Sequence, residues 1–541
     1  MIDILIKNGS IVDGTGSAAF EADIAISNGK ISAIGRSIFC EAGEVIDASG
    51  LVVAPGFIDV HSHNDLVPFM EERVRNLKLM QGVTTELVGQ CGLGVVPCVE
   101  AENPVWKNYI RGVVGDPGIS WEFYDLDKYF TDINVKELKN NFASLISHGA
   151  VRTRVMGFDS RTPDGKELRS MCRIVSDAME SGAFGMSLGL QYMPAIFSSR
   201  EELVDICKVV KGYGGIVMVH LRNHDSSMVE ALEEIAAVAE ASKVKLHISH
   251  MRSYNSAELG CKAEILLEFV DIARRRDIDI TFDEHLYLSG STLMTQLLPP
   301  WLTEKGSESL LCSLKCKEVL ERVKEELSDT RIRYKGWDNY SAIKGWDGIL
   351  ITSVKTDGNK AYIGKTVGEI ARSLGIHPVD LVSGLLVEEQ TGVGIVTLGV
   401  FSEEDTIKLI QHPLQMVGSD SIPAGVPHPR LYGNYPLFIG KFVREKKALS
   451  LEAAIRKCTL LPAETLGIKG LGQLKAGYAA DITIFDFNKI NGYEDYSNST
   501  LPPIGIRDVV LGGKLAVKDG VPCVESHGRV IVHNKPICNA P

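Results

Sequence analysis

In the middle of the chain, short apolar runs alternate regularly with amphipathic stretches, and few folds accommodate this order. Residues 214–219, 244–249 and 278–282 are the apolar runs, and residues 227–242 and 263–276 between them have helical periodicity. This β-α-β-α-β order predicts a parallel sheet, because neighbouring parallel strands must be joined by a crossover.

The pattern continues over about 350 residues, which is typical of an α/β protein with a (β/α)8 TIM barrel of roughly 250 residues plus insertions. A doubly wound sheet is the structural alternative. The chain has no G-x-G-x-x-G or G-x-x-x-x-G-K-[ST] motif after a strand, so the sequence gives no support for nucleotide binding.

The two ends of the chain differ from the middle, because they consist of short strand-like runs between turns. These runs include residues 4–6, 23–26, 29–34, 481–485 and 509–514. Two β-rich ends around a different middle predict one small β domain that is built from both termini.

The composition is that of a globular protein. The 541 residues are 45% hydrophobic and 23% charged, which supplies a large core and argues against a disordered or fibrous chain. The formal net charge of -12 argues against general binding to nucleic acid or to anionic membranes. No uncharged apolar run reaches about 18 residues, so we expect no membrane span.

The N-terminus and the cysteines favour a cytoplasmic location. The first residues lack a basic region that leads into an apolar segment and a cleavage site, so we expect no secretory signal. The 11 cysteines are odd in number and have no framework spacing, which predicts reduced thiols. They stand at positions 40, 91, 98, 172, 207, 261, 312, 316, 458, 523 and 538.

Four histidines stand at or just beyond the ends of strand-like runs. His61 and His63 end an apolar run that begins at residue 52, and strand periodicity puts both on one face. His220 and His250 each follow a further run. Each alone is more often a structural histidine. Together they lie at the carboxyl ends of three predicted barrel strands, where barrel enzymes have their active sites, and imidazole binds metal ions.

A thiol and a carboxylate complete the candidate metal ligands. Cys91 follows a strand-like run and is bounded by glycines, which allow close approach. A thiolate favours zinc over magnesium or calcium, although a buried cysteine is more often inert. Asp420 ends a short apolar segment, and a carboxylate there can serve as ligand and general base. The alternative for Asp420 is an ordinary turn residue.

These residues, in this order, resemble the amidohydrolase superfamily and within it the N-acyl-D-amino-acid deacylases (D-aminoacylases). The matching segments are residues 55–63, 82–92, 185–190, 220–222, 248–252, 345–351, 418–420, 427–433 and 472–482. The first segment, Pro-Gly-Phe-Ile-Asp-Val-His-Ser-His, is general to the superfamily. The Gly-x-Cys-Gly and Pro-His-Pro-Arg segments and the full sequential order are more specific to the deacylases.

The resemblance implies a (β/α)8 barrel beside a small β-sandwich made from both termini. Residues 1–54 and 465–541 would form the sandwich. Residues 55–464 would form the barrel, with an inserted segment at about 286–345.

The resemblance also implies zinc at one tight site, with a second, weaker site. Cys91, His220 and His250 would hold the tight zinc, while His61 and His63 would belong to the second position. Asp420, near both, would deprotonate the attacking water and later protonate the leaving amine.

The substrate's own carboxylate needs a cation. Arg252 lies two residues beyond His250 on the same strand face, and Arg430 follows Asp420 by ten residues. A guanidinium fork suits a carboxylate, although a structural salt bridge is the alternative for either arginine.

The chain departs from the family at two expected substrate contacts. His285 stands where relatives usually have a tyrosine, and Arg252 stands where some have lysine. We expect His285 and Tyr287 near the substrate, and His285 is a candidate for stabilising the developing oxyanion.

The predicted function is therefore hydrolysis of the amide bond of N-acyl-D-amino acids or close analogues. The expected partner is a small molecule that carries a carboxylate and an N-acyl group. One alternative is a cyclic-amide hydrolase such as a hydantoinase or dihydropyrimidinase, and another is a non-catalytic barrel. The sequence leaves the oligomeric state open.

Overall fold

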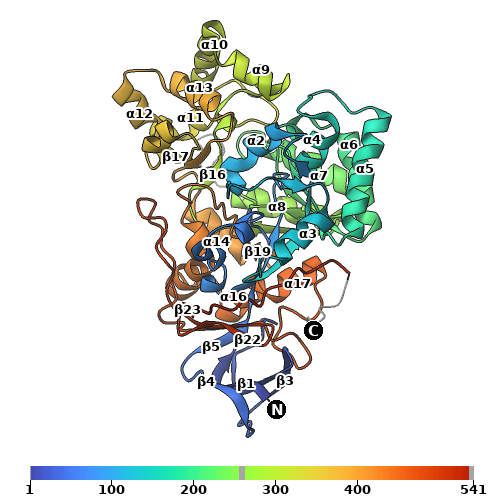
Figure 1. Ribbon diagram of the computed structural model, residues 1–541, viewed down its shortest axis with the longest axis vertical. Helices are drawn as coiled ribbons and strands as arrows, with labels where there is room; N and C mark the ends of the chain where they lie inside the picture. The colour runs from blue at the N-terminus through green and yellow to red at the C-terminus, as the bar shows by residue number, and fades with distance from the viewer. Residues whose placement is uncertain (1, 255–261, 535–541) are drawn as a thin grey trace.

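The computed structural model describes residues 2–254 and 262–534. Parallel strands and the helices between them occupy its middle, the inserted helices lie at the top of the view, and the terminal strands lie at the bottom (Figure 1). The central strands form two parallel sheets, in the orders β10-β7-β6 and β11-β12-β13-β14-β15-β19. Their bounds are β6 (Phe57–Asp59), β7 (Val83–Val88), β10 (Asn141–Ser144), β11 (Ile146–Ser147), β12 (Gly185–Gly189), β13 (Ile216–His220), β14 (Lys245–Ile248), β15 (Ile280–Glu284) and β19 (Gln415–Val417).

The parallel pairing predicted for residues 214–282 is confirmed. β13 pairs with β14, and β14 pairs with β15, both in parallel. Every residue of β12, β13 and β15 is buried, because helices cover the sheet, and this explains why these strands are continuous apolar runs. The intervening helices are α4 (His148–Met156), α5 (Gly165–Glu180), α6 (Arg200–Gly212), α7 (Met228–Ser242), α8 (Ala263–Arg275) and α14 (Glu403–Gln411).

The two central sheets approach each other at both ends. Leu145 separates β10 from β11, and its amide donates a hydrogen bond to the Val88 carbonyl at 3.0 Å. At the other ends, an isolated parallel bridge joins Ser62, beyond β6, to Ser421, beyond β19. Segments that are 359 residues apart in sequence therefore meet beside the candidate site.

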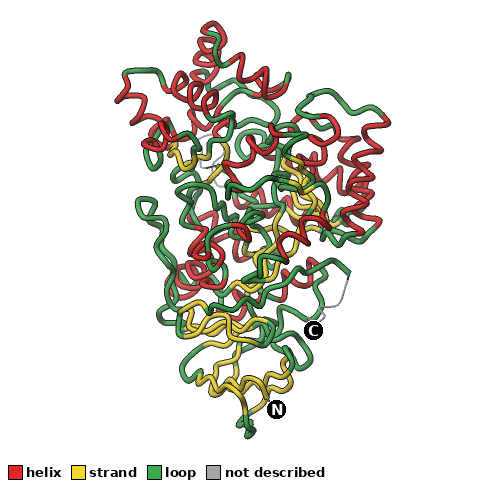
Figure 2. The backbone as a smooth tube through the Cα atoms, in the orientation of Figure 1, coloured by secondary structure: helices red, strands yellow, loops and turns green. Residues whose placement is uncertain are grey.

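Strands from both termini share one nine-stranded sheet, in the order β23-β22-β21-β20-β5-β1-β2-β3, with β4 also paired to β1. Figure 2 shows these strands gathered at one end of the molecule. Their bounds are β1 (Ile2–Ile11), β2 (Phe20–Ser27), β3 (Lys30–Gly35), β4 (Ala42–Asp47), β5 (Val52–Pro55), β20 (Ile482–Phe485), β21 (Ile506–Leu511), β22 (Lys514–Lys518) and β23 (Val521–Pro522).

The segment between β15 and β19 contains the residues that the sequence predicts as an insertion, about 286–345, and continues beyond them. It contains an antiparallel sheet in the order β16-β18-β17, and five helices that gather at the top of Figure 1. The bounds are β16 (Gly290–Leu293), β17 (Ile349–Ser353), β18 (Gly394–Thr397), α9 (Gly306–Ser313), α10 (Lys317–Ser328), α11 (Tyr340–Lys344), α12 (Val367–Leu374) and α13 (Pro378–Glu388). The capping box of Thr366 and Glu369 and the proline at the start of α13 are ordinary helix signals. Such signals cannot distinguish an inserted helix from a helix between the central parallel strands.

The remaining elements connect these parts. They are α1 (Glu72–Arg75), α2 (Pro104–Val114), α3 (Leu126–Asn134), α15 (Arg430–Leu437), α16 (Leu451–Cys458), α17 (Leu460–Leu466), β8 (Cys98–Val99) and β9 (Glu122–Phe123). A π-helix at Phe438–Glu445 continues α15. No single helix in the described ranges is long and apolar enough to cross a membrane. The neighbouring helices α12 and α13 together have the length and composition of a span, but they are bent by 102° at the break between them.

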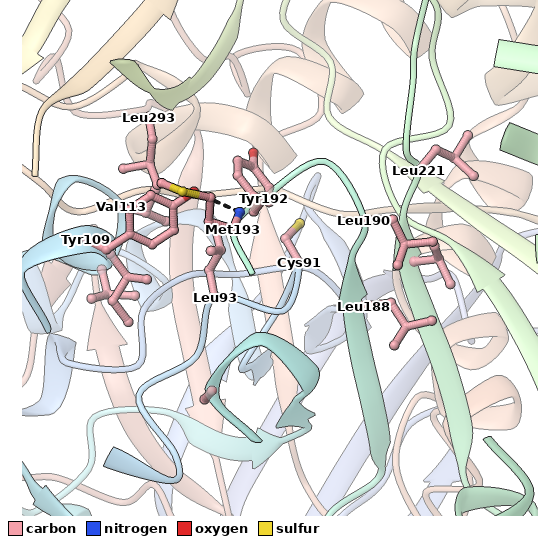
Figure 3. Packing of buried hydrophobic residues seen from close by; sticks show 14 of the residues in the cluster. Cys91, Leu93, Tyr109, Val113, Leu188, Leu190, Tyr192, Met193, Leu221 and Leu293 are labelled. Carbon is pink, nitrogen blue, oxygen red and sulfur yellow. Dashed lines mark hydrogen bonds between the residues drawn. The ribbon is translucent and has the colours of Figure 1, made fainter. Parts of the chain in front are cut away.

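The nine cysteines in the described part of the chain are free. Cys261 and Cys538 lie outside the described residues. Cys91 lies in the main hydrophobic core together with Leu93 and Tyr192, and Figure 3 shows these three side chains among their apolar neighbours.

Candidate metal centre

The six predicted ligands come together at the carboxyl ends of the parallel strands. His61 and His63 follow β6, Cys91 follows β7, and His220 is the last residue of β13; His250 follows β14 and Asp420 follows β19. Their donor atoms form three overlapping triads, and within each triad all atoms lie within 4.8 Å of one another. The triads are His61, His63 and Cys91; Cys91, His220 and His250; and His61, His250 and Asp420.

Cys91 lies at the centre of this cluster. Its Sγ is 3.3 Å from His61 Nε2 and 3.5 Å from His250 Nε2. His250 Nε2 is 2.9 Å from His220 Nδ1. One thiol and two imidazoles that converge in a buried position form a donor set suited to zinc.

Asp420 lies on the other side of the cluster, beside the first two histidines. Its Oδ1 is 3.5 Å from His61 Nε2 and 3.3 Å from His63 Nε2. The donors therefore fit one zinc at Cys91, His220 and His250. They also leave His61, His63 and Asp420 as ligands for a second metal.

The chain turns sharply where it presents three of these side chains. The backbone φ angles of Cys91, His250 and Asp420 are 53°, 33° and 47°. These values lie in the left-handed region that residues other than glycine rarely adopt. Gly89, one of the glycines expected to allow close approach near Cys91, lies against the backbone of Leu145. A Cβ at position 89 would lie 2.4 Å from the Leu145 carbonyl oxygen. The backbone is thus strained at the positions where these three candidate ligands leave the strands.

Asp283, at the end of β15, orients two of the histidines, and sequence reasoning missed this role. Its Oδ2 lies 3.1 Å from His61 Nδ1 and 2.8 Å from His247 Nε2, and its Oδ1 accepts a hydrogen bond from the His250 amide at 3.0 Å. A carboxylate behind a ligand histidine fixes the ring and its tautomer. The available signal was an acid that directly follows the apolar run 278–282.

Gln191 has a similar effect on His220. Its Oε1 lies 2.9 Å from His220 Nε2, which leaves Nδ1 for the cluster. Gln191 lies in the turn beyond β12, and no sequence pattern distinguishes it from other turn residues.

A buried lysine binds the side chains on both sides of Asp420. Lys78 Nζ donates to the side-chain oxygens of Asp59, Ser419 and Ser421, with distances of 2.8 and 2.9 Å to the two serines. Because Asp59 precedes His61 and the serines flank Asp420, this one ammonium group links the two loops.

The charges around Asp420 and Cys91 set their protonation. Burial opposes ionisation of Asp420, but Arg430 and His61 outweigh it and hold the pKa of this carboxyl well below its usual range. Burial raises the pKa of the Cys91 thiol, and the neighbouring His61 only partly offsets this. Zinc binding would therefore displace a proton from Cys91, since the thiolate is the ligand.

Comparison with known proteins places the chain in a family. The Amidohydrolase family matches residues 44–284 and 356–517. The chain belongs to the amidohydrolase family.

Among relatives in this family, the N-acyl-D-glutamate deacylase of Alcaligenes xylosoxydans xylosoxydans is 30% identical, over 100% of this chain and 98% of its own length. The D-aminoacylase of the same organism is 28% identical, over 98% and 97%. A crystal structure of N-acyl-D-glutamate deacylase from Bordetella bronchiseptica, complexed with zinc and a phosphonate inhibitor, superposes with a TM-score of 0.83. It is 27% identical and covers 98% of this chain and 99% of its own. A D-hydantoinase, with a TM-score of 0.56 at 16% identity, shares the fold alone.

Three of the candidate metal ligands of this amidohydrolase face a cavity. Asp420, His220, His250, Arg430 and His285 all line it. The other lining residues are Tyr192, His224, Tyr254, Gly290, Ser291, Thr292, Tyr340, Thr397, Val400 and Phe401.

The two predicted carboxylate-binding arginines are placed differently. Arg430 is fully buried in the cavity wall, with Nη1 3.0 Å from Asp420 Oδ2. This ion pair lacks hydrogen-bond geometry, and the Arg430 guanidinium donates no hydrogen bond to the described residues. Arg252 is instead held by protein groups. It donates to Glu284 Oε1 and the Tyr287 carbonyl, both at 2.6 Å, and to Thr406 Oγ1 at 2.8 Å.

His285 and Tyr287 also differ. His285 lines the cavity, and burial together with Arg252 and Arg430 holds the pKa of its imidazole well below its usual range. Tyr287 is fully buried behind the cavity wall, and its hydroxyl donates to the Pro429 carbonyl at 3.3 Å.

Proposed function

We propose that this chain is a zinc-dependent amidohydrolase that hydrolyses the amide bond of N-acyl-D-amino acids. The observation that carries the proposal is the buried Cys91, His220 and His250 triad, with Asp420 and Arg430 beside it in one cavity. Relatives that share the whole length of the chain are named for this reaction, and the preference for D substrates rests on those names.

Cys91, His220 and His250 would hold the tight zinc, and His61 and His63 a weaker second metal, with Asp420 near both. One solved D-aminoacylase is described as activated by one metal and attenuated by a second, which supports unequal sites here. When bound, zinc supplies a Lewis acid for the amide carbonyl and lowers the pKa of water to about 7.

The protein's own groups do the rest of the chemistry. Asp420 is ionised at neutral pH, so it accepts a proton from the attacking water and delivers it to the leaving nitrogen. Arg430 offers free donors in the cavity and would bind the substrate's α-carboxylate as a fork. Arg252 would not bind the substrate itself. It would stabilise the cavity wall through its hydrogen bonds to Glu284, Tyr287 and Thr406. His285, whose imidazole lines the cavity and has a lowered pKa, would donate a hydrogen bond to the developing oxyanion.

We further propose that the parallel strands make up a (β/α)8 barrel, because the sheets meet at the Ser62–Ser421 bridge and at Leu145. The terminal strands would form a small β-sandwich, with domain boundaries near residues 54 and 464. The free cysteines support a reducing, cytoplasmic location.

The test is release of primary amine from a panel of N-acetyl amino acids, in D and L forms, by protein of measured metal content. We expect turnover of D substrates only, which a chelator abolishes and zinc restores. Zinc-containing protein that turns over no linear amide would refute the proposal.

A further inference from the structure

The charged groups of the cavity match a substrate that carries a single carboxylate. Among the described residues that line it, Arg430 is the one guanidinium or ammonium group and Asp420 is the one carboxylate. Residues 255–261, which follow the lining residue Tyr254 in sequence, contain no lysine or arginine. If Arg430 takes the α-carboxylate, no second cation in the described wall remains for an acidic side chain.

Arg252 cannot supply that second cation. Its guanidinium lies 4.4 Å over the ring of Phe401 and is already bound by Glu284, Tyr287 and Thr406. Phe401 is a lining residue and Arg252 is not, so an aromatic ring faces the cavity in front of the charge.

The wall contributed by the inserted segment and its borders is uncharged, and its aromatic rings lie beside the hydroxyl side chains of Ser291, Thr292 and Thr397. The ring of Tyr254 lies 5.2 Å from that of Tyr340 and 5.9 Å from that of Phe401. The hydroxyls of Tyr254 and Tyr340 are 2.5 Å apart and bond to each other. Val400 extends this surface. These side chains offer dispersion and hydrophobic contact to a substrate side chain, with no charge.

We propose that this cavity selects N-acyl-D-amino acids with uncharged, apolar side chains and rejects those with acidic side chains. The inference rests on the proposed deacylase function and adds the substrate class. An ionised side-chain carboxylate would be buried without a cation, and an unpaired buried charge is costly. The proposed specificity differs from that of the relatives named for N-acyl-D-glutamate and N-acyl-D-aspartate. It does so although the N-acyl-D-glutamate deacylase, at 30% identity, is slightly more similar to this chain than the D-aminoacylase, at 28%.

The experiment compares kcat/KM of the zinc-loaded enzyme for N-acetyl-D-methionine, N-acetyl-D-glutamine and N-acetyl-D-glutamate. Glutamine and glutamate have nearly the same shape and differ in charge. We expect methionine to exceed glutamate by about 10²–10³-fold, the loss typical of an unpaired buried charge, with glutamine between them. Turnover of glutamate at or above that of methionine overturns the inference and leaves the deacylase function standing. Turnover of none of the three refutes the proposed function and the inference with it.

A variant tests the same point by supplying the missing charge. Ser291 lines the cavity from β16 and is only partly buried, so a longer side chain has room to reach outward. Ser291→Arg should raise the glutamate-to-methionine ratio of kcat/KM by at least about 10-fold, whereas the uncharged Ser291→Gln should not. An equal rise in both variants would show that size and not charge controls the ratio, and would overturn the inference.

Discussion

The Asp283 carboxylate lies 3.1 Å from Nδ1 of His61 and so directs the opposite ring nitrogen, Nε2, toward Cys91 and Asp420. Removing this charge should loosen the ring and reduce its basicity. We expect Asp283→Asn to weaken binding of the second metal, the one that His61 would hold, by about 10–100-fold, the usual effect of losing a carboxylate behind a ligand histidine. Competition with a chromophoric chelator measures this affinity. The exposed Asp279→Asn, just before β15, is the matched control, and equal affinity in both variants would contradict the assigned role.

Cys91 should be indispensable for the tight zinc. Cys91→Ala removes the one sulfur donor among the clustered ligands, so zinc content and activity should be lost together. Elemental analysis after dialysis gives the stoichiometry. Cys207→Ala, at another buried cysteine away from the cluster, should keep both. Stoichiometric zinc in the Cys91 variant would refute the ligand assignment.

Asp420 should contribute to the rate more than to the tight metal site. Asp420→Asn keeps the shape of the side chain but cannot accept the proton, so kcat should fall by at least about 10²–10⁴-fold while the tight zinc remains. Steady-state kinetics and metal analysis on the same sample separate the two effects. Near-normal turnover would exclude Asp420 as the general base.

The two arginines should respond differently to the same conservative change. Arg430→Lys keeps the positive charge beside Asp420 but loses the fork, so we expect KM for N-acetyl-D-methionine to rise by at least about 10-fold. Arg252→Lys breaks contacts to Glu284, Tyr287 and Thr406, so it should lower Tm with a smaller effect on KM. A KM effect confined to the Arg252 variant would reverse these roles.

Glu284 should make the stability depend on pH. Burial raises the pKa of its carboxyl to about 7, although Arg252 opposes this. Because the folded state holds this proton more tightly than the unfolded state, the contribution is fully present below about pH 4 and is lost as the pH rises through 7. Across pH 5–8, wild type should therefore lose about 1–3 kcal/mol of unfolding free energy relative to Glu284→Gln.

Denaturant unfolding of both proteins at several pH values measures this difference. The exposed Glu268→Gln on α8 should follow wild type at every pH. A constant difference between wild type and Glu284→Gln across this range would show that Glu284 keeps one protonation state.

Much of the candidate metal centre could be predicted because the residues that make it up occupy equivalent places in a repeated pattern. Each follows or ends a short apolar run, and the carboxyl ends of parallel strands share one edge. Thus His61, His220, His250 and Asp420 could be grouped from sequence, although up to 359 residues separate neighbouring loops. The predicted helices at 227–242 and 263–276 follow from local periodicity in the same way.

The sequence by itself therefore determined the parallel α/β architecture and the types of residue at the strand ends, since both depend on local order along the chain. Only the tertiary structure decided which polar group faces which. Asp283 meets His61 across 222 residues, Arg430 turns to the cavity, and Arg252 turns to Glu284. The same structure packed α12 against β17 of the inserted sheet, and α13 against α12. These side-chain contacts depend on burial and on partners that are distant in sequence, so no local sequence pattern predicts them.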